Sequence, residues 1–149
     1  MGSDLYRLCI GYRALNKLTK KISFALPAIQ DILDSLNDKR FFISLDMRSG
    51  YFCISISPKT WHVAAYQVTG SAKVQPTVLP FGLANSSAVY LRLMNRTLEG
   101  LLYKSCYSFA DDVLIGYKTA EEHVKDLELV LDRLQQANIK IHPGKCKNQ

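Results

Sequence analysis

Three aspartates lie where predicted strands end, and a rigid strand end can hold oxygen ligands against a metal ion. Asp46 follows the β-prone run 41–45, and Asp111 and Asp112 separate two further strand-like runs. Magnesium takes near-octahedral oxygen coordination, keeps several waters, and is completed by one or two carboxylates and substrate phosphates. Two such ions, about 3.5–4 Å apart, stabilise the attacking and leaving oxygens of an in-line phosphoryl displacement. This chemistry is what the three acids could support.

The same acids also have a structural interpretation. Aspartate is common in turns because it hydrogen-bonds its own backbone and tolerates the left-handed conformation. A single aspartate at a strand end, such as Asp46, is more often a cap than a ligand. Successive side chains of a strand point to opposite faces, so Asp111 and Asp112 cannot both aim equally at one site. One of the pair would be the main ligand and the other subsidiary.

Three helices are predicted around these acids. Apolar residues in 29–36 recur at i, i+3, i+4 and i+7, which is the stripe of an amphipathic helix. A second helix spans about 86–102, with Gly100 weakening its last turn. A third opens with a capping box at 119–122 and ends near Asn138.

Strand signals occur between the helices and place Asp111 and Asp112 at the tip of a hairpin. The segment 68–76 is interpreted as the extended tip of another hairpin. The predicted strands are 41–45, 52–57, 107–109, 113–117 and an edge strand at 140–142. The order of elements predicts an α+β domain in which helices pack on one face of an antiparallel sheet.

Composition narrows the class of protein. The 149 residues suit a single domain, and a formal net charge of +6 suits a polyanionic partner. No apolar run approaches the roughly 20 residues of a membrane helix, so no membrane partner is expected. The four cysteines form no C-x-x-C pair, which favours reduced thiols inside the cell, in the cytoplasm or the nucleus. Residues 1–3 have the composition of an expression-tag remnant.

Five segments carry the most specific pattern in the sequence. They are 8–19 (LCIGYRALNKLT), 44–51 (SLDMRSGY), 79–86 (LPFGLANS), 109–112 (FADD) and 139–146 (IKIHPGKC). In this order and near this spacing they resemble reverse transcriptases of gypsy-type LTR retrotransposons and retroviruses. The resemblance runs from about Leu5 to Lys147. It implies a right-hand polymerase core in one domain, 4–149, with an antiparallel palm sheet and partial fingers but no thumb or RNase H.

The resemblance also implies roles at the catalytic centre. Asp46 and Asp111 would be the principal ligands of Mg²⁺ or Mn²⁺, with Asp112 as the third acid. Tyr51 would be the steric gate, an aromatic ring under the sugar that leaves no space for a ribose 2′-hydroxyl. Lys145 would protonate the leaving pyrophosphate.

Further residues would surround the incoming nucleotide. Arg7 would pair with its phosphates and stack on its base, two tasks that a guanidinium suits. Phe81 and Gly82 would line the nucleotide and template floor. The residues expected against the sugar and triphosphate are Phe52 and the backbone of Met47, Arg48 and Ser49.

Three functions follow as hypotheses. The first is an RNA-directed DNA polymerase that extends a primer on an RNA or DNA template from dNTPs. The second is a domesticated, catalytically silent module that binds nucleic acid or protein, as a homodimer or with a host protein. Differences from the family at Gly11, Ala110 and 86–87 favour this second hypothesis. The third is a basic α+β nucleic-acid-binding domain whose motif match is accidental.

Overall fold

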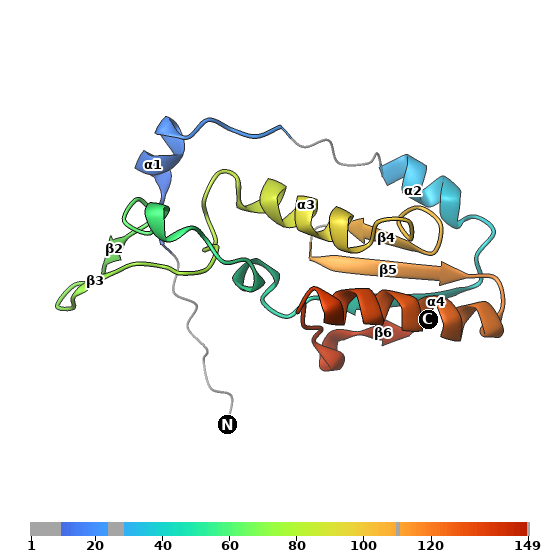
Figure 1. Ribbon diagram of the computed structural model, residues 1–149. Helices are drawn as coiled ribbons and strands as arrows, with labels where there is room; N and C mark the ends of the chain where they lie inside the picture. The colour runs from blue at the N-terminus through green and yellow to red at the C-terminus, as the bar shows by residue number, and fades with distance from the viewer. Residues whose placement is uncertain (1–9, 24–28, 110, 149) are drawn as a thin grey trace, which may run out of the picture.

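A four-stranded antiparallel sheet in the order β4-β5-β1-β6 lies at the centre of the fold (Figure 1). The computed structural model describes residues 10–23, 29–109 and 111–148. The strands are β1 (Phe41–Asp46), β4 (Cys106–Phe109), β5 (Asp112–Tyr117) and β6 (Lys147–Asn148). β1 pairs with β5 along its whole length, from Phe41 opposite Tyr117 to Asp46 opposite Asp112. This register brings the two acidic strand ends together.

Two helices, α3 (Ser86–Thr97) and α4 (Ala120–Gln136), pack on one face of the sheet. The sequence produces this face because alternate residues of each strand point to the same side. The core contains apolar residues from β1 and β5 and from the facing stripes of both helices: Ile43, Leu45, Val113, Ile115, Tyr90, Met94, Leu98, Val130 and Leu134. The predicted α+β fold, with helices against an antiparallel sheet, is confirmed.

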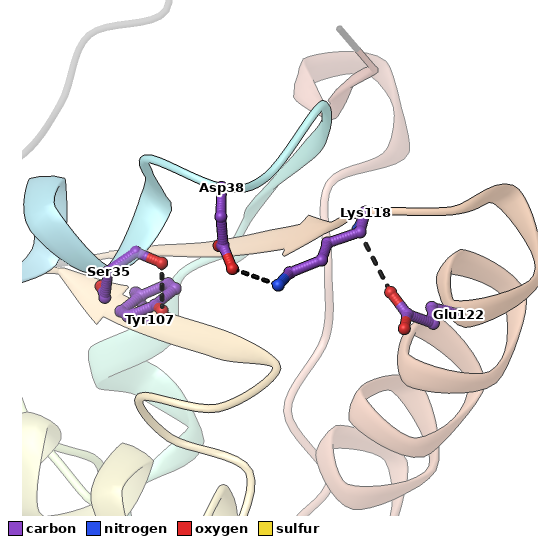
Figure 2. Close-up of polar contacts among 5 residues, drawn as sticks. All are labelled: Ser35, Asp38, Tyr107, Lys118 and Glu122. Carbon is purple, nitrogen blue, oxygen red and sulfur yellow. Dashed lines mark hydrogen bonds and ion pairs between the residues drawn. The ribbon is translucent and has the colours of Figure 1, made fainter.

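The opposite face of the sheet is covered at one end by α2 (Ile29–Leu36). A Cβ added at Gly116 would lie 3.1 Å from Leu36 Cδ2 and 3.3 Å from Phe42 Cδ1, so glycine permits this close approach. Figure 2 shows the polar contacts in the same region: Tyr107 donates a hydrogen bond to the Ser35 carbonyl (3.4 Å), and Lys118 forms an ion pair with Asp38. These contacts attach α2 and the segment after it to the sheet.

α4 begins with the predicted capping box, with one difference in its contacts. The Thr119 hydroxyl accepts a hydrogen bond from the Glu122 amide (3.3 Å), as expected. The Glu122 carboxylate reaches one residue further back and accepts from the Lys118 amide at 3.2 Å (Figure 2). The box therefore satisfies two amides and starts the helix where the sequence indicated.

Two predicted strands are wrong. Residues 50–53 form a short 3₁₀ turn, η1 (Gly50–Cys53), and beyond it Ser55 makes only an isolated bridge to Val78. The turn forms because the amides of Phe52 and Ile54 donate to carbonyls three residues back, at 2.8 and 3.2 Å, instead of to a neighbouring strand.

The predicted edge strand at 140–142 is the second one that is wrong. Ile141 makes only an isolated bridge to Met47, and the strand at this edge of the sheet is β6. The predicted second helix is shorter than 86–102, because it ends at Thr97 and Gly100 turns the chain with φ +82°.

The remaining elements lie beside the sheet, at the left of Figure 1. They are α1 (Arg13–Leu18), η2 (Pro58–Thr60) and the two-stranded pair β2 (Tyr66–Gln67) and β3 (Lys73–Val74). The pairing of β2 with β3 confirms the predicted hairpin, and Gly70 supplies a positive φ in its tip. Within the described residues, no helix has both the length and the apolar character needed to cross a membrane. The cysteines among the described residues, Cys53, Cys106 and Cys146, are free thiols.

Gly50→Ala is expected to destabilise the protein. An added Cβ would lie 2.7 Å from both the hydroxyl oxygen and Cζ of Tyr90, a ring that is fully buried and cannot swing away. Overpacking of this kind costs about 1–3 kcal/mol. Urea denaturation should show a lower midpoint with an unchanged slope. Gly11→Ala is the matched control because nothing lies within 4 Å of its added Cβ, and equal midpoints for the two variants would contradict the expectation.

Candidate active site

The structure brings the three predicted acids together at one end of the sheet. Asp46 and Asp112 are directly opposite each other in the β1–β5 register. Asp111 precedes β5, and its carbonyl accepts a hydrogen bond from the Met47 amide at 3.0 Å. The strand that carries Asp46 is thereby attached to the turn that carries Asp111. Leu45 and Val113 fill the core face, so Asp46 and Asp112 lie on the other face of the sheet.

This arrangement concentrates negative charge. Like charges directly opposite each other on neighbouring strands are destabilising. Burial raises the pKa of Asp111 above its ordinary value, and the nearby carboxylates of Asp112 and Asp46 raise it further. The Oδ1 atom of Asp111 is buried and has no hydrogen-bond partner among the described residues. A bound cation would offset the repulsion between the carboxylates and would give the buried Asp111 oxygen a partner. These residues therefore fit a divalent metal.

The protein alone does not build a closed metal cage here. In the described part of the chain, no three His, Cys, Asp or Glu side chains are grouped so that they could hold an ion. Magnesium is commonly held by one or two carboxylates together with substrate phosphates and water. The site therefore suits an ion that binds together with a phosphorylated substrate.

The predicted lysine reaches the same acids. Lys145 ends η3 (Pro143–Lys145), and its Nζ lies 3.7 Å from Asp46 Oδ2. The His142 amide donates to the Asp46 carbonyl at 2.8 Å, which attaches this segment to β1. The lysine side chain is 62% exposed, and exposed ion pairs are weak. Breaking the ion pair between Lys145 and Asp46 therefore costs little free energy.

Aromatic rings form one wall beside the acids. The Tyr51 ring centroid lies 5.0 Å from that of Phe81 and 5.2 Å from that of Tyr90, and the Phe52 and Phe81 centroids are 5.0 Å apart. The Tyr51 hydroxyl is 3.2 Å from Ser87 Oγ on α3. The predicted gate and the predicted floor residue Phe81 are therefore in contact, and the gate ring has a fixed orientation.

The backbone between Asp46 and the aromatic wall is only partly available to a ligand. The Met47 side chain is buried in the core, and its amide already donates to Asp111. The Arg48 amide donates to the Lys140 carbonyl at 2.7 Å. Ser49 adopts the left-handed conformation with φ 54°, which is rare outside glycine and is a feature of functional loops.

A cavity of about 350 Å³ borders three of the predicted nucleotide contacts, Arg48, Ser49 and Phe52. Lys140 lines the same cavity, together with Cys53 and Asn138. The cavity thus has two cationic side chains in its wall, which suits an anionic ligand such as a polyphosphate.

Asn16 is a positioning residue that the sequence did not single out. Its side-chain amide donates to the Gly82 carbonyl at 2.8 Å, and its side-chain oxygen accepts from the Ala84 amide at 2.7 Å. Gly82 has φ +90°, and an added Cβ would lie 3.3 Å from the Ile10 carbonyl oxygen. Asn16 and Gly82 therefore set the path of the loop that carries Phe81. The predicted nucleotide contact Arg7 lies outside the described residues.

Comparisons with known proteins agree with this geometry. Solved structures of foamy virus protease–reverse transcriptase have the same fold. The one in complex with an RNA/DNA hybrid superimposes with a TM-score of 0.85 at 25% identity, over 97% of this chain and 19% of that chain. The Pol polyprotein of transposon gypsy from Drosophila melanogaster is 33% identical over 146 residues, which are 98% of this chain and 14% of the polyprotein.

A shorter relative matches over most of its own length. The RNA-directed DNA polymerase homolog of Oenothera berteroana is 37% identical over 131 residues, which cover 83% of this chain and 89% of that protein. The family profile described as reverse transcriptase (RNA-dependent DNA polymerase) matches residues 2–149. The resemblance seen in the five sequence segments is thereby confirmed, and the chain belongs to the reverse transcriptase family.

Proposed function

We propose that this chain is the fingers–palm core of an RNA-directed DNA polymerase. The observation that carries the proposal is the position of Asp46, Asp111 and Asp112 at the same end of the sheet, with a buried and unpartnered oxygen on Asp111. The chain spans 14% of the polyproteins of transposons 297 and gypsy, so the activity of the whole protein is part of the proposal. The retained acids do not favour the alternative of a catalytically silent binding module.

The substrates in this proposal are a template–primer and dNTPs. Support comes from the net charge of +6 and from foamy virus reverse transcriptases solved with an RNA/DNA hybrid and with double-stranded DNA. Free thiols at the described cysteines support action in a reducing compartment of the cell.

Each residue has a distinct task in the proposed mechanism. Asp46 and Asp111 would hold Mg²⁺ or Mn²⁺, with Asp112 adding negative charge beside them. When bound, the metal supplies Lewis-acid stabilisation of the attacking and leaving oxygens. The Tyr51 ring excludes a 2′-hydroxyl from the sugar site. Lys145 leaves Asp46 for the substrate phosphates and gives a proton to the leaving pyrophosphate.

Calorimetric titration of Mn²⁺ in the presence of template–primer and dNTP tests the metal site. We expect Asp46→Asn to weaken Mn²⁺ binding by at least about tenfold, because it replaces an anionic ligand with a neutral one. Asp38→Asn is the matched control, since Asp38 is exposed and pairs with Lys118 beyond the opposite end of β1 and β5. Unchanged binding by the Asp46 variant would exclude this residue as a ligand.

A further inference from the structure

Tyr90 carries a hydroxyl that its surroundings do not explain. The residue lies in the middle of α3, is 1% exposed, and its hydroxyl has no hydrogen-bond partner within the described residues. A buried polar group without a partner is costly, whereas phenylalanine would fill the same space without that cost. The hydroxyl therefore calls for a hydrogen-bond acceptor close to it.

The position of the hydroxyl limits what that partner can be. The Tyr90 ring packs on Tyr51, and the hydroxyl oxygen is 2.7 Å from where a Cβ of Gly50 would lie. It thus sits beneath the segment that connects Asp46 with Tyr51. Burial raises the pKa of Tyr90, and the carboxylate of Asp111 is the foremost of the charges that raise it further. A phenol hydroxyl is a hydrogen-bond donor, so this group suits a carboxylate beside it.

Asp111 presents the complementary group. Its Oδ1 is a buried acceptor without a partner, in the electrostatic range of a buried donor without a partner. We propose that Tyr90 is a positioning residue, whose hydroxyl donates a hydrogen bond to the Asp111 carboxylate and orients its other oxygen toward the catalytic cation. The inference rests on the proposed metal site. Neither atom is hydrogen-bonded among the described residues, so the proposed bond requires a reorientation of the Asp111 carboxylate, and it would satisfy a buried donor and a buried acceptor at once.

The chain contains a matched control for this role. Tyr117 is also 1% exposed and also has an unpartnered hydroxyl. It lies at the opposite end of the β1–β5 pair, facing Phe41, and its ring packs on His123 at 4.2 Å. Burial alone raises the pKa of Tyr117, with no contribution from an acid. Tyr90→Phe and Tyr117→Phe therefore remove the same atom from two equally buried sites, and only one of these sites faces the acids.

The test measures Mn²⁺ affinity calorimetrically, with template–primer and dNTP, and the urea midpoint without metal. A ligand's supporting hydrogen bond typically contributes 10–100-fold to metal affinity, so we expect Tyr90→Phe to weaken Mn²⁺ binding by about tenfold. Its metal-free midpoint should equal or exceed that of the wild type, since an unsatisfied hydroxyl is removed. Tyr117→Phe should bind Mn²⁺ as the wild type does.

The possible outcomes separate the inference from the function on which it rests. Wild-type affinity in Tyr90→Phe, with binding lost in Asp111→Asn, overturns the role of Tyr90 and leaves the metal site intact. Equal weakening by both tyrosine variants overturns it too, because hydroxyl loss would then act through the fold. If the wild-type protein binds no Mn²⁺, or Asp111→Asn binds it equally well, both proposals fail.

Discussion

Asp111→Asn is expected to reduce primer extension on the order of a thousandfold or more. The substitution keeps the size of the side chain but removes the charge that would hold the cation at the hairpin turn. Metal ions contribute several kcal/mol of transition-state stabilisation, and about 4 kcal/mol corresponds to a factor of about a thousand. The measurement is primer extension with Mg²⁺ or Mn²⁺ by the protein expressed at the full length of its natural reading frame.

The loss should not come from unfolding. The pKa of Asp111 is raised in the folded protein, so between its ordinary value of 3.8 and the raised value the folded state binds more protons than the unfolded state. The free energy of unfolding therefore falls as pH rises through this window, and the ionised carboxylate destabilises the metal-free fold at neutral pH. Asp111→Asn should raise the metal-free unfolding midpoint at pH 7 and leave it nearly unchanged below pH 3.8. Asp38→Asn serves as the extension control, and full extension by the Asp111 variant would contradict the assigned role.

Tyr51→Val is expected to increase incorporation of ribonucleotides relative to deoxyribonucleotides by about 10–100-fold. An apolar site that only has to reject an added hydroxyl discriminates by about a hundredfold, and this discrimination depends on a ring that cannot move aside. The Tyr51 ring is held by Phe81, by Tyr90 and by the contact of its hydroxyl with Ser87. Single-nucleotide extension with dNTP and rNTP, compared as kcat/KM, measures the change.

Tyr51→Phe is the control that separates the ring from its hydroxyl. It keeps the ring against Phe81 and Tyr90 and loses only the contact with Ser87. We expect this variant to retain most of the sugar discrimination. If Tyr51→Val discriminates as strongly as the wild type, the sugar is excluded by another part of the site.

The features that sequence alone determined are the local ones. The period of apolar residues located α2, α3 and α4, and the capping box located the first residue of α4. The acids could be placed at strand ends because the β-prone runs 41–45, 107–109 and 113–117 border them directly. These predictions succeeded because each depends on residues within a few positions of one another, where backbone geometry and side-chain direction act together.

The features that only the tertiary structure decided depend on distant residues. Alternation at 52–57 indicated a strand, but the amides of Phe52 and Ile54 donate within the η1 turn, and beyond it the segment makes only an isolated bridge from Ser55 to Val78. Asn16 reaches a loop 66 and 68 residues away, a contact that no local pattern contains. The acids themselves show the same division. Their presence could be seen in the sequence. The buried Oδ1 of Asp111 and the buried, unpartnered hydroxyl of Tyr90 became apparent only in the folded structure, in which Tyr90 of α3 packs in the core.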